Sequence, residues 1–115
     1  MPSSSLISIV DDDDSVRESL SGLIRSVGFR VMVFASAEEF LNSNHFSDTD
    51  CLILDVRMPG MNGLDTIRSA VSQRPSLHAL LMTGYADEEA VAEARDRVPV
   101  IRKPIDLDEL MRRIA

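Results

Sequence analysis

The chain has 115 residues, a net charge of -7, 44% hydrophobic and 27% charged residues, which is typical of one folded domain with an apolar core. No apolar run approaches the ~20 residues of a membrane span, and the small, polar N-terminus lacks the features of a secretory signal. The negative charge argues against nucleic-acid binding by this chain alone, because binding phosphates needs clustered basic residues. The single cysteine, Cys51, lies in an apolar run and predicts a reduced core residue, so we expect a cytoplasmic protein.

The first strand is predicted at Leu6–Val10, a short apolar run that stops at the acidic run Asp11–Asp14. Apolar residues then recur at helical spacing over Val16–Val27. The polar residues Asp13–Ser15 are suited to start this helix, and Gly28 is placed to end it.

The next elements are shorter. A second strand is predicted at Arg30–Phe34, and Ser36–Glu39 has the form of a capping box that opens a helix through about Leu41. The polar segment Asn42–Asp50 is expected to be a surface connection. An apolar run predicts a third strand at Cys51–Leu54, buried on both faces.

Pro59, Gly60 and Gly63 break regular secondary structure, so a loop is predicted over Met58–Gly63. Apolar residues at helical spacing mark a helix over Leu64–Val71, and Pro75 lies just beyond its end. A fourth strand is predicted at His78–Met82, and it runs into Thr83-Gly84.

The last third of the chain repeats this alternation. Asp87–Glu89 puts negative charge on the first turn of an expected helix with a weak apolar face. A short strand is predicted at Val100–Arg102, ending in Lys103-Pro104, and a final helix is marked by apolar positions over Leu107–Ile114.

Five strands alternating with five helices predict an α/β fold, a flavodoxin-like doubly wound parallel sheet with strand order 2-1-3-4-5. In such a sheet the carboxyl ends of all strands lie at one edge. The residues delivered to that edge are Asp11, Asp12, Asp55, Thr83 and Lys103.

Three carboxylates in one cleft need a counter-charge, and Mg²⁺ is a hard cation that prefers oxygen ligands. The ammonium group of Lys103 can reach an anion as a point charge, and the hydroxyl of Thr83 can donate a hydrogen bond to it. Together these groups form a site for accepting a phosphoryl group on the carboxylate of Asp55.

Four motifs occur in order along essentially the whole chain, with near-standard spacing: Val10–Asp12, Leu54–Gly63, Thr83-Gly84 and Lys103-Pro104. On these motifs the chain resembles a receiver domain of a two-component response regulator, and the resemblance implies one receiver domain over residues 1–115. The first half is similar to receivers of FixJ-type regulators. The segments Leu81–Tyr85 and Pro99–Pro104 are more similar to receivers attached to hybrid sensor kinases.

The resemblance implies a role for each residue of the metal site. Asp12 and Asp55 would bind Mg²⁺ through their side chains, and Asp11 would assist through a water molecule. Arg57 would contribute its backbone carbonyl.

For the phosphoryl group, the resemblance implies that Asp55 is the phosphoacceptor. Thr83 would be the switch hydroxyl that moves onto the phosphoryl group, and Lys103 would pair with its oxygens. The peptide bond between Lys103 and Pro104 would be cis, which is tolerated before proline.

Three features depart from the family pattern. Val100 occupies the position of the usual switch aromatic residue, and the interval from Thr83 to Lys103 is shorter than in typical receivers. Tyr85 and Arg57 occupy positions that control access of water to an aspartyl phosphate, and the bulk of Tyr85 predicts slow to moderate self-hydrolysis.

The implied function is a signalling switch that takes a phosphoryl group from a partner histidine kinase. Phosphorylation would change the face formed by the helix at Asp87–Glu89, the strand Val100–Arg102 and the helix Leu107–Ile114. This face would control an output domain or form a homodimer. The domain would not be a turnover enzyme, and we expect no direct binding to nucleic acid or membrane.

Two alternatives remain open. A phosphatase of the haloacid dehalogenase type would carry a second aspartate two residues after its nucleophile, where this chain has Arg57. A phosphorylation-independent interaction module is favoured slightly by Val100 and disfavoured by the acidic residues, Thr83 and Lys103.

Several residues also have simple structural interpretations. Asp13 and Asp14 are expected to complement a helix dipole, and the isolated His45 and His78 are expected to have no role in a site. The last helix reaches Ala115 without a stop signal, which is expected of a boundary within a longer protein or of a short stand-alone receiver.

Overall fold

The computed structural model describes residues 5–56, 63–84, 92, 98–103 and 105–114. Its strands are β1 (Leu6–Val10), β2 (Arg30–Phe34), β3 (Cys51–Asp55), β4 (His78–Thr83) and β5 (Val100–Arg102), and its helices are α1 (Asp14–Ser26), α2 (Ala37–Leu41), α3 (Gly63–Gln73) and α5 (Leu107–Ile114). Of the helix expected to begin at Asp87–Glu89, the structure describes only Ala92, which is helical, and the peptide bond to Pro104 lies outside the described residues.

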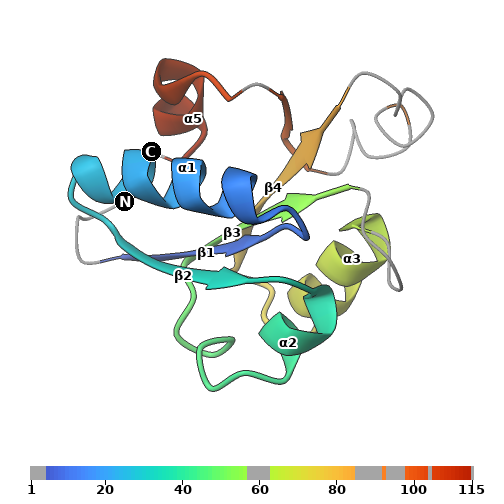
Figure 1. The fold of residues 1–115 in the computed structure, drawn as a ribbon. Coiled ribbons are helices and arrows are strands. Elements are labelled where there is room, and N and C mark those ends of the chain that lie inside the picture. Colours follow the sequence, from blue (N-terminus) through green and yellow to red (C-terminus); the bar gives the residue numbers. More distant parts are fainter. Residues whose placement is uncertain (1–4, 57–62, 85–91, 93–97, 104, 115) are drawn as a thin grey trace.

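The five strands form one parallel sheet in the order β2-β1-β3-β4-β5, which confirms the predicted topology. Helices α1 and α5 cover one face of the sheet, and α2 and α3 cover the other (Figure 1). Each face has its own core, because successive strand residues point to opposite sides. Leu20 and Leu110 pack on the first face, whereas Phe40 and Ile67 pack on the second.

Helix α1 begins and ends where the sequence predicts. Asp13 caps its start, since the Asp13 carboxylate accepts the backbone N–H groups of Ser15 and Val16. Gly28 follows the helix with a φ angle of 103°, a left-handed conformation that costs little only in glycine.

Helix α2 shows a variant of the expected capping box. The hydroxyl of Ser36 accepts the N–H of Glu39 at 3.1 Å, as predicted. The Glu39 carboxylate reaches back to the N–H of Ala35 at 2.9 Å, one residue earlier than in a standard box.

The connection between α2 and β3 is only partly the surface segment that the sequence predicts. Thr49 is fully buried, with its hydroxyl 2.7 Å from that of Ser8 on β1. Phe46 packs against the core of the second face. The guanidinium group of Arg74 donates hydrogen bonds to the carbonyls of Phe46 and Thr49, at 2.7 and 2.5 Å. Hydrogen bonds to the backbone therefore allow a polar sequence to enter the interior.

Cys51 is fully buried in the core of the first face. Burial, together with the nearby Asp50 carboxylate, raises the pKa of its thiol to about 12, so the thiol stays protonated at neutral pH. His78, expected to have no role in a site, places a ring nitrogen 2.7 Å from the carbonyl of Arg113 in the last turn of α5. Within the described residues, no helix is both long and apolar enough to cross a membrane.

Candidate functional site

Three carboxylates meet at the carboxyl edge of the sheet. Val10 and Leu54 are partners in the β1–β3 ladder, so Asp11 and Asp55, the next residues, emerge side by side. Carboxylate oxygens of Asp11, Asp12 and Asp55 lie within 4.8 Å of one another. The structure thus brings together the three acids that the sequence predicts. Asp11 and Asp55 are buried and Asp12 is exposed.

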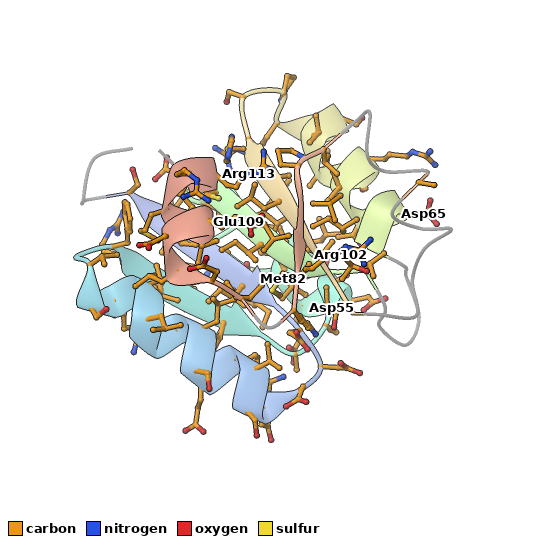
Figure 2. All side chains as sticks on the ribbon, turned by 90° about the horizontal axis from the view of Figure 1, so that it is seen from above. Asp55, Asp65, Met82, Arg102, Glu109 and Arg113 are labelled. Atoms are coloured by element: carbon orange, nitrogen blue, oxygen red, sulfur yellow. The ribbon has the colours of Figure 1, made fainter. Side chains whose placement is uncertain are left out.

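Asp55 is the last residue of β3 and is not in the following loop. It pairs in register with Met82 on β4, and the N–H of Val56 donates to the Met82 carbonyl at 2.8 Å. Met82 lies in the interior, whereas Asp55 lies at the edge of the sheet (Figure 2). The backbone on both sides of the Asp55 carboxylate is therefore held by the ladder.

Lys103 supplies the counter-charge at this edge. Its ammonium nitrogen lies 2.9 Å from a carboxylate oxygen of Asp55 and 3.1 Å from one of Asp11. The backbone N–H of Lys103 donates to the Thr83 carbonyl at 2.8 Å, which fixes the start of this long side chain. With the three acids ionised, the formal charge of the four groups is -3 + 1 = -2.

Burial has opposite effects on the two signs of charge. Burial raises the pKa of Asp11, and the negative charge of Asp55 raises it further. The hydrogen bond from the Asp13 N–H and the interaction with Lys103 lower it, but the pKa remains raised overall. Burial by itself would lower the pKa of Lys103, but its hydrogen bonds to Asp55 and Asp11 outweigh this effect and the pKa is raised. The site therefore favours a protonated lysine and disfavours a further uncompensated anion.

Thr83 ends β4 beside these charged groups. Its side chain is fully buried, and its hydroxyl donates to the carbonyl of Gly84 at 3.2 Å. Val100, at the position expected for an aromatic switch residue, is half-buried and packs against the core of the second face. Arg57 and Tyr85 lie outside the described residues.

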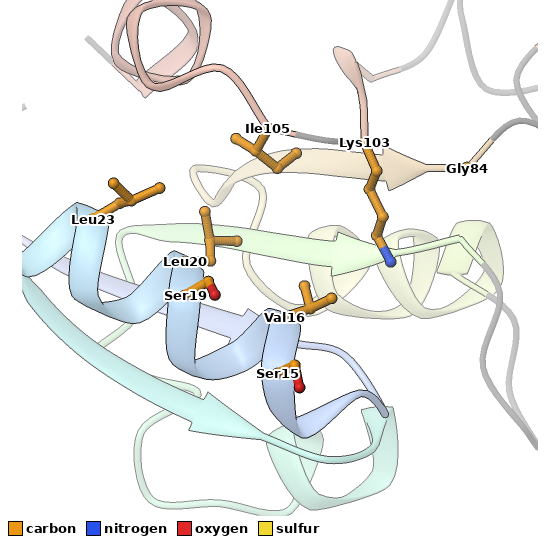
Figure 3. A pocket seen from close by; sticks show the side chains of 8 residues that line it. All are labelled: Ser15, Val16, Ser19, Leu20, Leu23, Gly84, Lys103 and Ile105. Atoms are coloured by element: carbon orange, nitrogen blue, oxygen red, sulfur yellow. The ribbon is translucent and has the colours of Figure 1, made fainter.

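A groove of about 520 Å³ adjoins the site between α1 and the segment after β5. Leu20, Leu23 and Ile105 line it, and the Lys103 side chain extends along one end toward β3 (Figure 3). The groove is mostly apolar, so the charged chemistry is confined to the sheet edge.

Arg17 is a neighbour of the site that sequence reasoning did not single out. Its guanidinium group donates to the backbone carbonyl of Asp11 at 2.5 Å and pairs with the Asp14 carboxylate. The available signal was an arginine in the first turn of a helix that follows an acidic run. Many exposed helices carry such an arginine, so the contact can be assigned only from the structure.

The response regulator receiver domain family matches residues 7–115. The chain belongs to this family. Receiver domains of this family are signalling domains of two-component response regulators, and membership implies phosphorylation-dependent signalling. The family expected from the four sequence motifs is thereby confirmed.

Similar receivers occur in known regulators. The response regulator protein TodT of Pseudomonas putida is 40% identical over 109 residues, which cover 93% of this chain and 48% of TodT. The transcriptional regulatory protein FixJ of Azorhizobium caulinodans is 36% identical over 108 residues, covering 92% of this chain and 51% of FixJ. The chain thus spans about half the length of the curated relatives it matches.

The receiver fold is also found in solved structures. The full-length structure of FixJ from B. japonicum matches with a TM-score of 0.83 and 33% identity, over 96% of this chain and 55% of that one. A receiver domain protein from Methanospirillum hungatei, described as CheY-like, matches with a TM-score of 0.81 over 96% of this chain. The flavodoxin-like sheet order is the order expected of this receiver fold.

Proposed function

We propose that this receiver accepts a phosphoryl group on Asp55 from a phosphohistidine of a partner histidine kinase. The observation that carries the proposal is the position of Lys103, whose ammonium group bridges the carboxylates of Asp55 and Asp11. A lysine held at this point can bind a phosphoryl oxygen next to the attacking carboxylate without a large rearrangement. Residues 1–115 would act as one such domain.

The donor set fits Mg²⁺. Asp11, Asp12 and Asp55 offer oxygen atoms within 4.8 Å of one another, and oxygen is the ligand that this cation prefers. With the three acids ionised, the three acids and Lys103 together keep a formal charge of -2, which a divalent cation would balance. The backbone carbonyl of Arg57 is a further proposed ligand. When bound there, the cation would neutralise charge on the transferring oxygens.

In the proposed step, a carboxylate oxygen of Asp55 attacks the phosphorus in line with the leaving nitrogen of the phosphohistidine. A phosphorus–oxygen bond forms and the phosphorus–nitrogen bond breaks, and its electron pair returns to the imidazole. Lys103 shifts from bridging two carboxylates to binding a phosphoryl oxygen. Thr83 turns its hydroxyl from the carbonyl of Gly84 toward the new anion.

The same residues indicate how phosphorylation would be transmitted to a partner. Thr83 pairs with Arg102 in the β4–β5 ladder, so a change at Thr83 reaches β5 directly. The small, half-buried Val100 cannot act as an aromatic switch, and the signal would be carried by the backbone of β5 and by α5. The receiving partner would be an output domain or a second copy of the chain.

The proposal is tested by incubating the chain with acetyl phosphate and Mg²⁺ and recording its intact mass. We expect a gain of one phosphoryl group, and no gain when EDTA is present from the start to remove the cation. Asp55→Asn should abolish the gain. Asp65→Asn removes an exposed carboxylate on α3 and serves as the matched control that retains it.

An equal gain on Asp55→Asn would contradict the assignment of the acceptor. No gain on the wild-type chain would contradict phosphoryl transfer itself and favour an interaction module that works without phosphorylation. Continuous release of phosphate from a generic phosphoester would instead indicate a turnover enzyme.

A further inference from the structure

Arg17 is unusually well covered for a helix-surface arginine. Its side chain is 15% exposed, whereas that of its ion-pair partner Asp14 is 89% exposed. The guanidinium group folds back over the start of α1 and donates to the Asp11 carbonyl at 2.5 Å. Because a planar guanidinium group presents several N–H donors in a fixed fork, it can hold this carbonyl and Asp14 together.

Arg17 completes the set of contacts that hold Asp11. The backbone N–H of Asp11 donates to the Phe34 carbonyl at 3.2 Å. One carboxylate oxygen of Asp11 accepts the N–H of Asp13 at 2.9 Å, and the other accepts the Lys103 ammonium group. The carbonyl is the remaining polar group of Asp11, and Arg17 is its side-chain donor.

The Asp11 carbonyl belongs to the peptide unit that leads into Asp12. Asp12 is exposed, and among the described residues its carboxylate has no hydrogen-bond or ion-pair partner. The position of this carboxylate therefore depends on the backbone from which the side chain extends. The peptide plane that Arg17 contacts sets the place of the Asp12 Cα atom at the site.

We propose that Arg17 is a positioning residue for the magnesium site. By holding the peptide unit between Asp11 and Asp12, it keeps the Asp12 carboxylate aligned with that of Asp55. The role rests on the proposed function, since it assumes that these acids bind Mg²⁺. Arg17 itself does not touch the cation or the phosphoryl group.

The direction of the change in Mg²⁺ affinity distinguishes a positioning role of Arg17 from a purely electrostatic one. A positive charge near a cation site repels the cation, so loss of Arg17 as a mere charge would tighten Mg²⁺ binding. Loss of a positioning residue weakens it. Arg17→Lys keeps the charge but lacks the planar fork, so it should also weaken binding.

The test is calorimetric titration of Mg²⁺ into the wild-type chain, Arg17→Ala, Arg17→Lys and Arg25→Ala. Arg25 is the matched control. It lies on the same helix, carries the same charge and also donates to a backbone carbonyl, that of Val31 at 3.2 Å. We expect both Arg17 variants to bind Mg²⁺ on the order of 10-fold more weakly, as when an outer partner of a metal ligand is lost. Arg25→Ala should stay within about two-fold of the wild type, because among the described residues the Arg25 side chain donates to Val31 and not to Asp11, Asp12 or Asp55.

A second readout follows the backbone directly. In ¹H–¹⁵N spectra without Mg²⁺, the amide signals of Asp12 and Asp13 should shift in Arg17→Lys and stay in place in Arg25→Ala. If Arg17→Ala does not fold, the Mg²⁺ affinity of Arg17→Lys and these amide shifts test the positioning role of Arg17.

Different results would overturn the proposed function and the role of Arg17. A wild-type chain that does not bind Mg²⁺ would overturn the proposed function and this role with it. A wild-type chain that binds Mg²⁺, with Arg17 variants that bind it as tightly as Arg25→Ala or more tightly, would overturn the role of Arg17 alone.

Discussion

Asp11 has a higher pKa than an ordinary aspartate because it is buried beside Asp55. The folded state therefore holds a proton on Asp11 at a pH where the unfolded chain has released it. This contribution lowers the free energy of unfolding as the pH rises through that interval, beginning near the ordinary aspartate pKa of about 4.

Asp11→Asn should consequently raise the free energy of unfolding at neutral pH in the absence of Mg²⁺. The difference from the wild type should shrink as the pH falls below about 4, where the wild-type side chain becomes protonated in both states. Mg²⁺ affinity should fall by about 10- to 100-fold. Urea unfolding at several pH values measures the first effect, and a variant less stable than the wild type at pH 7 would contradict it.

Lys103 is the only lysine in the chain, so its titration can be observed without interference from other lysines. Its hydrogen bonds to Asp55 and Asp11 raise its pKa despite partial burial. The stabilisation that results is complete below the ordinary lysine pKa of about 10.4 and is lost as the pH rises through the raised value.

The measurement is the pH dependence of the Lys103 ε-carbon signal in protein made with ¹³C-labelled lysine. Without Mg²⁺, the pKa should lie above that of lysine in an unfolded peptide, and Asp55→Asn should lower it. Added Mg²⁺ should also lower it, because a bound cation competes for the same carboxylates. A pKa that does not respond to Asp55→Asn would show that the bridge at 2.9 Å does not form in solution.

At the scale of elements, the connection between α2 and β3 is held by Arg74, which follows α3. Arg74 donates to two carbonyls of this connection, and its guanidinium carbon lies 6.0 Å from the centre of the Phe46 ring. These contacts join the segment after α3 to the segment after α2. They lie at the end of the sheet where β3 and β4 begin, away from the acidic site.

Arg74→Met should lower the free energy of unfolding by about 1–3 kcal/mol, because it leaves partly buried carbonyls without their charged donor. Arg68→Met, on α3, is the control. Arg68 is 46% exposed and pairs with Asp65 at 3.6 Å, so its loss should cost at most about 1 kcal/mol. Hydrogen exchange at the Thr49 amide should accelerate in Arg74→Met only, and equal losses in both variants would contradict the assigned role.

The elements also show where sequence reasoning reaches its limit. The apolar, β-branched runs of β1, β2 and β5 gave correct bounds. Strands β3 and β4 each extend one residue further, to Asp55 and Thr83, because backbone pairing continues through a polar residue that an apolar pattern excludes. The contacts of Thr49 with Ser8 and Arg74 depend on the third dimension and leave no periodic signal in the sequence.

The candidate site was more predictable than these details. In a parallel sheet all strand ends meet at one edge, so the topology brings Asp11, Asp55 and Lys103 together once the strands are assigned. The contact between Arg17 and the Asp11 carbonyl was not predictable in this way, since it depends on the path of one peptide unit.

In the whole molecule, the two faces of the sheet have separate cores, and the charged edge lies where β1 and β3 end. The groove between α1 and the segment after β5 opens beside Lys103. Binding of a dianion at this edge would therefore act on both β5 and the groove beside it, as a two-state switch requires.

The central claim is that Asp55 becomes an acyl phosphate. The most direct measurement is to treat the chain with acetyl phosphate and Mg²⁺, reduce it with sodium borohydride and map its peptides by mass spectrometry. Borohydride reduces an aspartyl phosphate to homoserine, so the modified residue is identified by its position. We predict homoserine at position 55 only, and none without the phosphodonor. Homoserine at Asp11 or Asp12, or its absence from every peptide of the treated chain, would contradict the account.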